Sequence, residues 1–476
     1  MSTAVGEARA AVAHAARVLA GLGLADLMYS ASARITGTDR IAVTPGWAGG
    51  PPAPHRTTPD DILVVDPGGT VREGRASAPP LLAAHLAFHR LRPDVGAAAF
   101  ICPPVTCAFG MARRTLLALP HMGGELAGGI AIDDRPGMPV GAARAEELVQ
   151  ASGDAPVVHL PGVGVFVVGA HVVGMLSTAY TLEYSLARVN AVAAQLPAGS
   201  LRLLRTEELA RIVGQRAGHG SYAAFFEAAD RPGPPPASEP SGTVEDVLRV
   251  KMAAACRILY AQGTLVAFLE HVSHRLPDGR RWLMSPAIHF GRMRPDDMIV
   301  LDEHAERLSG PSPAMFRFYH RDILAARPDV QAIVHTHDIY GRMFAQAGIA
   351  PQPVWRIGAL HCNEPLPVFP QADLLFDEAP RRGAVRALGQ HAVVHELGHG
   401  TDFVAPTLEE ATVRAVQRET LLRAHFRALR LGTPAALPAE TLHDLSLCSP
   451  EWTAWWAFYA ALEADGVVPP DVMAGW

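Results

Sequence analysis

The chain has 476 residues, and several short motifs occur in it twice, in the same order and at nearly constant spacing. Three pairs lie 235 or 236 residues apart: Arg92-Pro-Asp-Val95 with Arg327-Pro-Asp-Val330, Pro59-Asp-Asp-Ile62 with Pro295-Asp-Asp-Met298, and Val157-Val-His159 with Val393-Val-His395. Arg17-Val-Leu19 similarly parallels Arg257-Ile-Leu259. Repetition at a fixed period indicates repetition of structure. We therefore expect two copies of one fold, each of roughly 200 residues.

One further pair of motifs departs from this spacing. Thr181-Leu-Glu183 parallels Thr407-Leu-Glu409 at a distance of 226 residues, so we expect about ten extra residues just before it in the first copy. Between the copies, Asp230–Thr243 is rich in Pro, Gly and Ser, which is typical of a semi-extended linker. The predicted organisation is a first domain at 1–229, a linker at 230–243 and a second domain at 244–476.

Hydrophobic periodicity within the second copy predicts alternating helices and strands. We expect helices at 244–262, 314–326, 340–348 and 408–431, and strands at 282–284, 298–301, 332–335 and 392–395. Interleaved elements of this kind are typical of a layered α/β domain. In the first copy, the most apolar run, Val157–Leu176, contains Pro161 and four glycines. It is therefore expected to form a pair of buried strands and not a membrane span.

Charge and composition exclude several classes of function. The 41 basic residues are balanced by 47 acidic ones, so nucleic acid is not a predicted partner. Lys251 is the only lysine, which excludes a phosphate-binding loop ending in Gly-Lys-Ser/Thr and leaves one residue for Schiff-base chemistry. Five scattered cysteines form neither a disulfide framework nor paired CxxC zinc motifs. The start of the chain lacks a signal-peptide pattern. We expect a cytoplasmic protein that does not bind membranes.

Two histidines mark the end of one expected strand in the second copy. His335 and His337 are two positions apart, and strand alternation points their rings to the same face. Two neutral imidazoles on one face suit Zn, Fe or Mn, provided that a third ligand is found elsewhere. A hydrogen-bonded pair of histidines at a strand end is the alternative interpretation.

The sequence around these histidines resembles the class II aldolase/adducin family. The resemblance rests on Arg327-Pro-Asp-Val-Gln-Ala-Ile-Val-His-Thr-His337, on Ile339-Tyr-Gly341 and on Gly398-His-Gly-Thr-Asp-Phe-Val-Ala-Pro-Thr-Leu-Glu-Glu-Ala411, and it extends over 244–431. It implies that His399 is the third ligand beside His335 and His337. The family fold implies a tandem pair of three-layer α/β/α domains, each built around a mainly antiparallel sheet. It also implies one divalent metal ion per chain, with Zn first and Fe(II), Mn and Co as alternatives.

A second metal motif overlaps the third histidine. His395-Glu-Leu-Gly-His399 matches the HExxH pattern of zinc proteases, in which a helix presents both histidines to the metal. The β-branched Val393-Val394 pair, the glycines at 398 and 400, and Pro406 instead favour a strand followed by a turn. We therefore expect this segment not to be helical and the protease hypothesis to fail.

The repeat predicts that the first copy has lost the metal site. In the repeat register, the positions of the three ligands are occupied by Phe100, Cys102 and Val163. The first copy is expected to be a structural domain that binds no metal.

The second copy also departs from the family at positions that matter for catalysis. Family lyases carry a glutamate four residues before a helix histidine; here that histidine is His320 and the position holds Phe316. His320 has a counterpart in His85, which suggests a packing role for both. The phosphate-binding Gly-Asn-x-Ser-x-Arg motif of the family appears as Glu270-His-Val-Ser-His-Arg275. We take His271 as the candidate catalytic residue. The candidate substrate-binding residues are Ser273, Arg275, Ser285, His289 and His361.

The resemblance implies a lyase that acts on a small carbonyl compound through a metal-stabilised enolate, in bacterial secondary metabolism. Retro-aldol cleavage and decarboxylation share that enolate, and decarboxylation needs no carbon-acid base. One alternative is a non-heme Fe(II) oxygenase that cleaves a 2-oxo or hydroxy acid oxidatively. Another is a non-catalytic interaction protein like adducin. The expected partners are a small-molecule substrate and a second copy of the chain, in a homodimer that forms a pseudo-four-fold ring.

Overall fold

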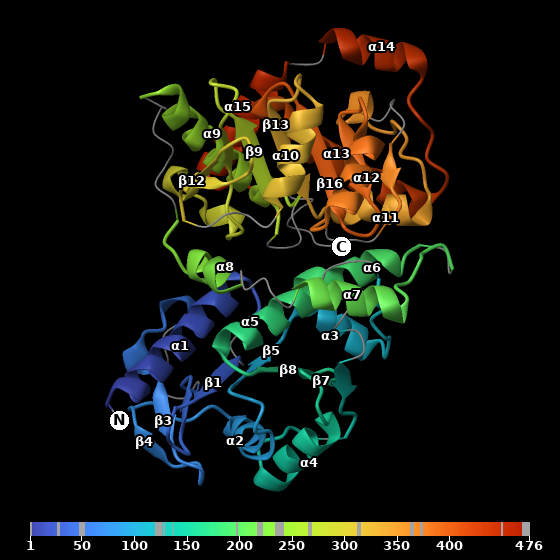
Figure 1. Ribbon diagram of the computed structural model, residues 1–476. Helices are drawn as coiled ribbons and strands as arrows, with labels where there is room; N and C mark the ends of the chain where they lie inside the picture. The colour runs from blue at the N-terminus through green and yellow to red at the C-terminus, as the bar shows by residue number, and fades with distance from the viewer. Residues whose placement is uncertain are drawn as a thin grey trace. The chain divides into compact units, whose positions relative to one another are not determined.

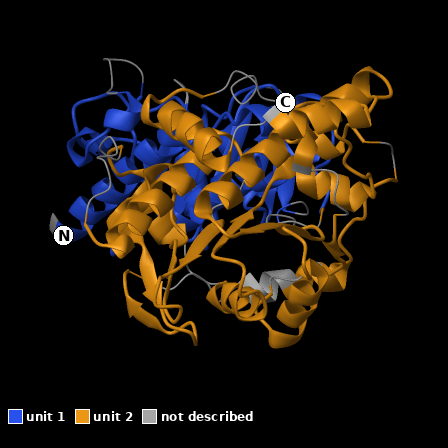
Figure 2. Ribbon diagram, turned by 90° about the horizontal axis from the view of Figure 1, so that it is seen from above, with its two compact units in different colours: residues 1–118, 122–190 blue, residues 119–121, 191–476 orange. Residues whose placement is uncertain are grey.

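The chain forms two compact units in a computed structural model (Figure 1). The model describes residues 2–468 except 26–28, 47–52, 120–125, 127–128, 136, 197–198, 217–221, 234–241, 265–268, 312–315, 362–365, 372–374 and 449–450. Unit 1 comprises residues 1–118 and 122–190, and unit 2 comprises 119–121 and 191–476 (Figure 2). Most of the predicted linker at 230–243 lies outside the described residues. The helices α7 (Thr206–Arg216) and α8 (Tyr222–Ala229), assigned from sequence to the first domain, belong to unit 2.

Unit 1 contains an eight-stranded sheet with helices on both faces. Its strands are β1 (Ser30–Arg34), β2 (Ile41–Val43), β3 (Leu63–Val65), β4 (Val71–Glu73), β5 (Ala97–Ile101), β6 (Ile130–Ile132), β7 (Val157–Leu160) and β8 (Gly164–Gly169). Its helices are α1 (Ser2–Gly21), α2 (Leu82–Leu91), α3 (Pro104–Met111), α4 (Ala142–Ser152), α5 (Val172–Tyr180), the π-helix η4 (Thr181–Ala187) and the start of α6 (Arg188–Ala193). The apolar run at 157–176 therefore forms the two strands β7 and β8 that the sequence predicts.

Unit 2 repeats this arrangement and adds two helices at its C-terminal end. Its strands are β9 (His271–Arg275), β10 (Trp282–Met284), β11 (Ile299–Leu301), β12 (Arg307–Ser309), β13 (Ala332–Thr336), β14 (Val368–Phe369), β15 (Val393–Glu396) and β16 (Gly400–Ala405). Its helices, besides α7 and α8, are α9 (Val244–Ala261), α10 (Arg317–Ala326), α11 (Ile339–Ala347), α12 (Glu378–Leu388), α13 (Leu408–Leu431), α14 (Ala439–Cys448) and α15 (Trp452–Ala464). The predicted helices and strands of this copy are confirmed to within a few residues.

The two sheets have the same strand order. It runs β4-β3-β2-β1-β5-β8-β7-β6 in unit 1 and β12-β11-β10-β9-β13-β16-β15-β14 in unit 2. Among the described strands, only the edge pairs β6–β7 and β14–β15 are parallel. The predicted fold, two tandem three-layer α/β/α domains around mainly antiparallel sheets, is confirmed.

Alternation along the strands of unit 2 separates two apolar cores. Val334 and Phe403 lie opposite each other and face the core formed with α9, α13 and α15. Ile333 and Val404 face the other core, formed with α10 and α12. The same alternation assigns each polar residue at the strand ends to one face, and this decides which of them can meet.

The repeated Arg-Pro-Asp-Val motif has the same structural role in both units. Arg327 pairs with Asp329 at 2.9 Å and donates to the carbonyl oxygen of Gly389 at 2.8 Å. Arg92 pairs with Asp94 at 2.9 Å and donates to the carbonyl oxygen of Gly153 at 2.7 Å. The motif therefore ties the turn before a central strand to the end of α12 or α4.

The prediction of ten extra residues in the first copy is wrong. Glu183 accepts from the backbone N–H of Val105 and Thr106, at the start of α3. Glu419 accepts from the backbone N–H of Tyr340 and Gly341 at the corresponding place in α11. Glu183 thus matches Glu419 at the constant spacing of 236 residues, and its chance similarity to the Thr407-Leu-Glu409 segment misled the alignment.

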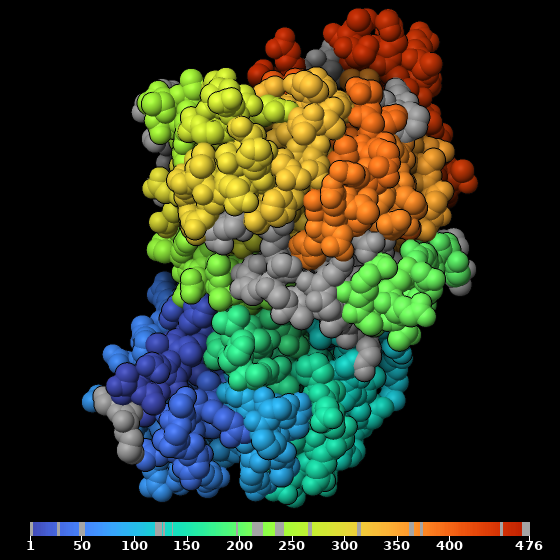
Figure 3. All heavy atoms as spheres, viewed as in Figure 1, coloured from blue at the N-terminus to red at the C-terminus, as the bar shows by residue number. Residues whose placement is uncertain are grey.

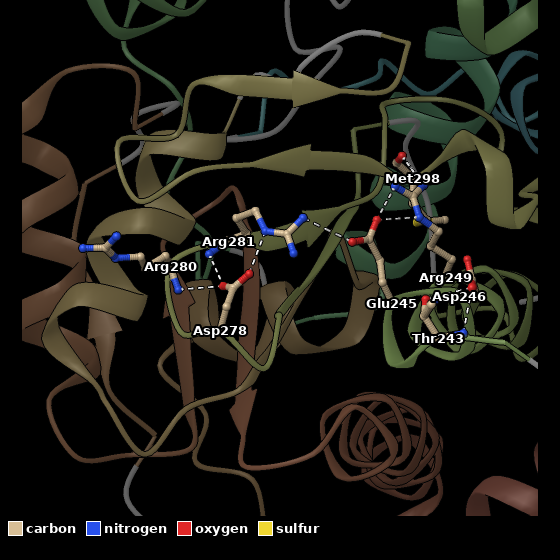
Figure 4. A network of polar contacts seen from close by, with 8 residues as sticks. All are labelled: Thr243, Glu245, Asp246, Arg249, Asp278, Arg280, Arg281 and Met298. Atoms are coloured by element: carbon tan, nitrogen blue, oxygen red, sulfur yellow. Dashed lines mark hydrogen bonds and ion pairs between the residues drawn. The ribbon is translucent and has the colours of Figure 1, made fainter.

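A polar network at the surface of unit 2 joins α9 to the sheet (Figure 4). The helix begins at a capping box, in which Thr243 and Asp246 satisfy each other's backbone N–H groups. Glu245 pairs with Arg249 at 2.9 Å and with Arg281, before β10, at 3.4 Å. Arg249 donates to the carbonyl oxygen of Met298 at 2.9 Å. These contacts tie α9 to the segments that precede β10 and β11, and β10 pairs with β9, the strand that carries His271 and Ser273.

The C-terminal helices complete the outer layer of unit 2. Trp452, Trp455 and Trp456 of α15 pack against the core beneath them. A hollow of about 550 Å³ lies among 356–360, α13, α14 and α15, and the site histidines do not line it. Figure 3 shows α14 at the outer surface of this unit. No helix among the described residues combines the length and the apolar character needed to cross a membrane.

Candidate metal centre

The structure brings His335, His337 and His399 together at one end of the unit 2 sheet. His335 lies near the end of β13, His337 directly after it, and His399 in the turn between β15 and β16. One ligand nitrogen from each ring lies within 4.8 Å of the other two, and all three side chains are buried. The Nε2 atoms of His335 and His337 are 3.4 Å apart.

Each of these histidines has a carboxylate beside its Nδ1 atom. Asp402, on the neighbouring strand β16, lies 2.8 Å from Nδ1 of His335. Glu396 bonds Nδ1 of His399, and Glu270 lies 3.6 Å from Nδ1 of His337. A carboxylate on Nδ1 holds the proton there and leaves the Nε2 lone pair available for a metal.

The three residues fit a divalent metal ion. Nε2 of His399 is buried and has no hydrogen-bond partner among the described residues, which is costly unless a ligand occupies it. Burial first, and the neighbouring His335 second, lower the pKa of His399 well below its ordinary value. The ring is therefore neutral, as a metal ligand must be. Three imidazoles with open positions beside them suit Zn, and also Fe(II), Mn and Co.

Glu396 and Asp402, the acidic groups beside His399 and His335, differ in protonation. Burial, with the charge of Asp402 next, raises the pKa of Glu396 well above its ordinary value. Burial also acts to raise the pKa of Asp402, but His335 and the hydrogen bonds outweigh it and the pKa is lowered. The hydroxyl of Tyr319 on α10 donates to Asp402 at 2.9 Å. The negative charge of this pair is therefore held on Asp402.

The zinc-protease interpretation of His395-Glu-Leu-Gly-His399 is wrong. His395 and Glu396 lie on strand β15 and not on a helix, so their side chains point to opposite faces of the sheet. His395 bonds the hydroxyl of Thr401 at 2.6 Å, on the face covered by α13. Glu396 lies behind His399 and does not serve as a base between two ligands.

His271, the candidate catalytic residue, lies against the metal ligands. Its ring stacks on His335, with centroids 4.4 Å apart and planes within 13°. Its Nδ1 bonds Nε2 of His320 at 2.6 Å, and Nδ1 of His320 bonds the hydroxyl of Ser273 at 2.6 Å. Nε2 of His271 is buried without a partner among the described residues, and burial first lowers its pKa well below the ordinary value.

The first copy retains the histidine and serine part of this hydrogen-bonded chain. His85, the counterpart of His320, bonds the hydroxyls of Ser30 and Ser32, each at 2.8 Å. Ser30 stands where the second copy has His271, since each pairs with the equivalent residue of the central strand. A packing role for the His85 and His320 pair agrees with these contacts, whereas His271 is specific to the second copy.

Three of the candidate substrate-binding residues make hydrogen bonds within the protein. Arg275 donates to the carbonyl oxygens of Val330, Leu324 and Arg327, and Arg34 makes the equivalent bonds in unit 1. Ser285 accepts from the backbone N–H of Val272 at 2.9 Å, as Thr44 does from that of Ala31. Ser273 bonds His320. Since a copy without the metal ligands makes the same contacts, we assign Arg275, Ser285 and Ser273 to the scaffold.

The other two candidates are not brought to the centre by any described contact. His289 is buried against Phe225 and Tyr260, and burial first lowers its pKa to about 4. His361 ends a short helical turn, and its side chain lies outside the described residues.

Phe316 occupies the position of the expected family glutamate. It precedes α10 and is buried, with its ring centroid 4.9 Å from that of His271 and 5.7 Å from that of His399. The second copy therefore has an aromatic ring where the family resemblance implies a carboxylate.

The first copy has lost the carboxylates as well as the ligands. Strand registers place Phe100 at the position of His335, and Phe166 at that of Asp402. Leu160 and Tyr29 replace Glu396 and Glu270. Cys102 and Val163 replace His337 and His399 and remain neighbours, since the Cys102 thiol lies 3.5 Å from the carbonyl oxygen of Val163. The sequence prediction missed the three carboxylates, because only the pairing of β13 with β16 shows that Asp402 faces His335.

Comparisons with known proteins identify relatives of this chain. The family model for the class II aldolase and adducin N-terminal domain matches residues 10–189 and 250–426, about three quarters of the chain. The chain is 28% identical over 228 residues to a 3,4-dihydroxyphthalate decarboxylase of Terrabacter sp., covering 44% of this chain and 93% of that protein. It is 29% identical over 197 residues to the 5-methylthioribulose-1-phosphate/5-deoxyribulose-1-phosphate aldolase of Rhodospirillum rubrum, covering 41% and 87%.

A solved structure of L-fuculose 1-phosphate aldolase from Glaciozyma antarctica aligns with a TM-score of 0.40 and 20% identity, covering 48% of this chain and 93% of that one. The family model matches each copy separately, and only the second copy carries the three histidines. The chain therefore belongs to the class II aldolase and adducin family, with two domains of that family in tandem.

Proposed function

We propose that the chain is a metal-dependent carbon–carbon lyase that decarboxylates or cleaves a small oxo or hydroxy acid in its second domain. The observation that carries this proposal is the set of three buried histidines, each with a carboxylate beside Nδ1. Family membership, with a decarboxylase and an aldolase among the relatives, supports a metal-dependent lyase at this general level.

Decarboxylation is favoured over aldol cleavage because of Phe316. Aldol chemistry needs a base that removes a proton from carbon or oxygen, and a phenyl ring cannot supply one. Loss of CO₂ leaves the bonding electron pair on the substrate carbon without removing a proton from it. The decarboxylase among the relatives makes the same reaction class a reasonable choice for this chain.

The metal ligands and His271 would have separate roles in the reaction. His335, His337 and His399 would hold the ion, which supplies a Lewis acid that draws electron density from the oxygen atoms of a bound acid. The carbon that loses CO₂ must then take up a proton. We assign this step to Nε2 of His271, which is buried and has no hydrogen-bond partner among the described residues. The chain Ser273–His320–His271, with each group donating to the next, keeps the proton of His271 on Nε2, and solvent water restores that proton after each turnover.

Metal analysis combined with a turnover assay tests the proposal. We expect the purified chain to contain about one divalent ion, with zinc first among the candidates, and to release CO₂ from an oxo or hydroxy acid equally well with and without oxygen. His337→Ala and His399→Ala should lose both metal and turnover, whereas His304→Ala, at an exposed loop position, should keep both. Turnover that requires oxygen would replace the proposal with the Fe(II) oxygenase. A metal-free, inactive chain would favour the adducin-like interaction protein.

We also propose that the chain is a homodimer in which the four domains form a pseudo-four-fold ring with two metal sites. The proposal extends the resemblance to ring-forming family members to a chain that carries two domains. Light scattering should then give twice the chain mass of 50.6 kDa. A monomeric mass at micromolar concentration would refute it.

A further inference from the structure

We propose that Phe316 and Phe376 form a wall beside the metal centre that receives the ring of an aromatic hydroxy acid. The inference rests on the proposed function and names its substrate class. An aromatic ring held by these side chains distinguishes the chain from lyases whose substrates are phosphorylated sugars.

The two phenyl rings stack on each other next to the ligands. Their centroids are 5.3 Å apart and their planes lie within 12° of each other. Phe316 is also nearly parallel to His335, at 19° and 6.3 Å. Its contacts with His271, His335 and His399 place the ring beside the metal ligands and the candidate catalytic residue.

Neighbouring elements hold Phe376 in place. Its carbonyl oxygen accepts a hydrogen bond from Arg381 of α12. Arg381 also pairs with Asp322 of α10 at 2.9 Å. Phe316 directly precedes α10, so both rings are attached to the same pair of helices. Phe376 is half-buried, whereas Phe316 is buried, and the pair therefore extends from the histidines towards the outside.

The first copy provides an internal comparison. Leu81 stands at the position of Phe316, with nearly the same backbone angles (φ −93° and ψ 18°, against −95° and 17°). Val140 stands at the position of Phe376, directly before the N-cap residue of α4 as Phe376 is before that of α12. The fold therefore does not require aromatic rings at these positions. Of the two copies, only the one with the three histidines carries aromatic rings at these positions.

Stacking on an aromatic ring favours flat, unsaturated ligands. An aromatic pair contributes about 0.5–1.5 kcal/mol beyond the area that it buries, which corresponds to about 2- to 10-fold in affinity. A phenyl ring offers no hydrogen bond to the hydroxyl groups of a sugar. The wall should therefore select ligands by whether they carry an aromatic ring, while the metal would bind their oxygen atoms.

Two probes with the same oxygen donors test this inference. Both 3-hydroxy-3-phenylpropanoate and 3-hydroxybutanoate carry a carboxylate and an aliphatic hydroxyl two carbons away, but only the first has a ring. Titration calorimetry on the zinc-loaded full chain should show that 3-hydroxy-3-phenylpropanoate binds about 5- to 10-fold more tightly, the upper part of that range. The double variant Phe316→Leu with Phe376→Val should reduce this preference to within about threefold, with binding of 3-hydroxybutanoate unchanged.

The design separates folding, metal binding and recognition. Leu and Val already occupy these positions in the first copy of the fold, so the variant should keep its melting temperature and its zinc content. Phe458→Leu, at an exposed position of α15, is the matched control and should leave the preference intact. Equal affinity for the two probes in the zinc-loaded chain, or a preference that survives in the double variant, would overturn the inference. Failure of the lyase proposal would be seen separately, because the unmodified chain would then contain no zinc or release no CO₂.

Discussion

At the scale of single residues, the ligand histidines depend on the carboxylates behind them. Asp402 is fully buried between His335 and the hydroxyl of Tyr319, and its charge stabilises the proton on Nδ1 of His335. That proton position directs Nε2 of His335 towards the metal. The carboxylate therefore acts on the metal through the histidine, as a positioning residue.

Replacement of Asp402 by asparagine should weaken metal binding about 10- to 100-fold. Asparagine keeps the shape of the side chain but removes the charge that fixes the tautomer of His335. A competition titration with a zinc chelator measures the change. The control Glu378→Gln removes an exposed carboxylate that pairs with Arg382 on α12, and its zinc affinity should be unchanged. Equal zinc affinity in Asp402→Asn and Glu378→Gln would contradict the role given to Asp402.

Sequence alone could identify the ligands but not their partners. His335 and His337 follow from the spacing of two residues in a strand, and His399 from the family resemblance. Asp402 is far in sequence from His335, and Glu270 from His337, and only the fold brings each carboxylate beside its histidine. Arg275 and Ser285 were predicted to bind substrate because a motif contains only residue types, whereas their actual partners are backbone groups.

At the scale of elements, the strand that follows His399 must begin with glycine. A Cβ atom on Gly400 would lie 2.7 Å from Nε2 of His335 and 2.6 Å from the carbonyl oxygen of Thr336. Gly164 provides the same room in unit 1, where a Cβ atom would lie 2.4 Å from the ring of Phe100. In both copies the strand β16 or β8 passes so close to the central strand that no side chain fits between them.

Gly400→Ala should therefore disrupt the metal centre before it unfolds the domain. The added methyl group forces His335 or the strand to move by several tenths of an ångström, and metal ligation tolerates displacements of only about 0.2 Å. We expect a large loss of zinc content and of turnover, measured by metal analysis and CO₂ release. Gly141→Ala, where a Cβ atom meets nothing within 4 Å, should behave like the unmodified chain. Full zinc content in Gly400→Ala would show that the site has more freedom than the structure indicates.

Helix and strand positions were predictable where the apolar pattern was strong. The helix at 408–431 was predicted to the residue, and Trp282–Met284 likewise as a strand. The alignment failed at Thr181–Glu183 in η4 of the first copy, because three similar residues matched in a wrong register. Only the equivalent hydrogen bonds of Glu183 and Glu419 restore the constant spacing.

At the scale of the whole molecule, the repeat was the most informative sequence feature. It predicted two domains of the same fold, and the two sheets have the same strand order. It could not predict the units as they form, because 191–229 lies between motifs and its helices belong to unit 2. The helices α14 and α15 also lie beyond the matched family region and have no counterpart in the repeat.

In unit 1, apolar side chains stand at several of the positions that form the metal centre in unit 2. Phe100 and Phe166 pack together there, with ring centroids 5.2 Å apart, inside one apolar core that also includes Leu160. Burial of such a side chain stabilises a fold by about 1.5–3 kcal/mol, whereas buried polar groups without partners destabilise it. The chain therefore carries both sides of a trade-off between activity and stability. One copy keeps the buried polar groups of the metal centre, and the other has the apolar side chains Phe100, Leu160 and Phe166 at the positions of His335, Glu396 and Asp402.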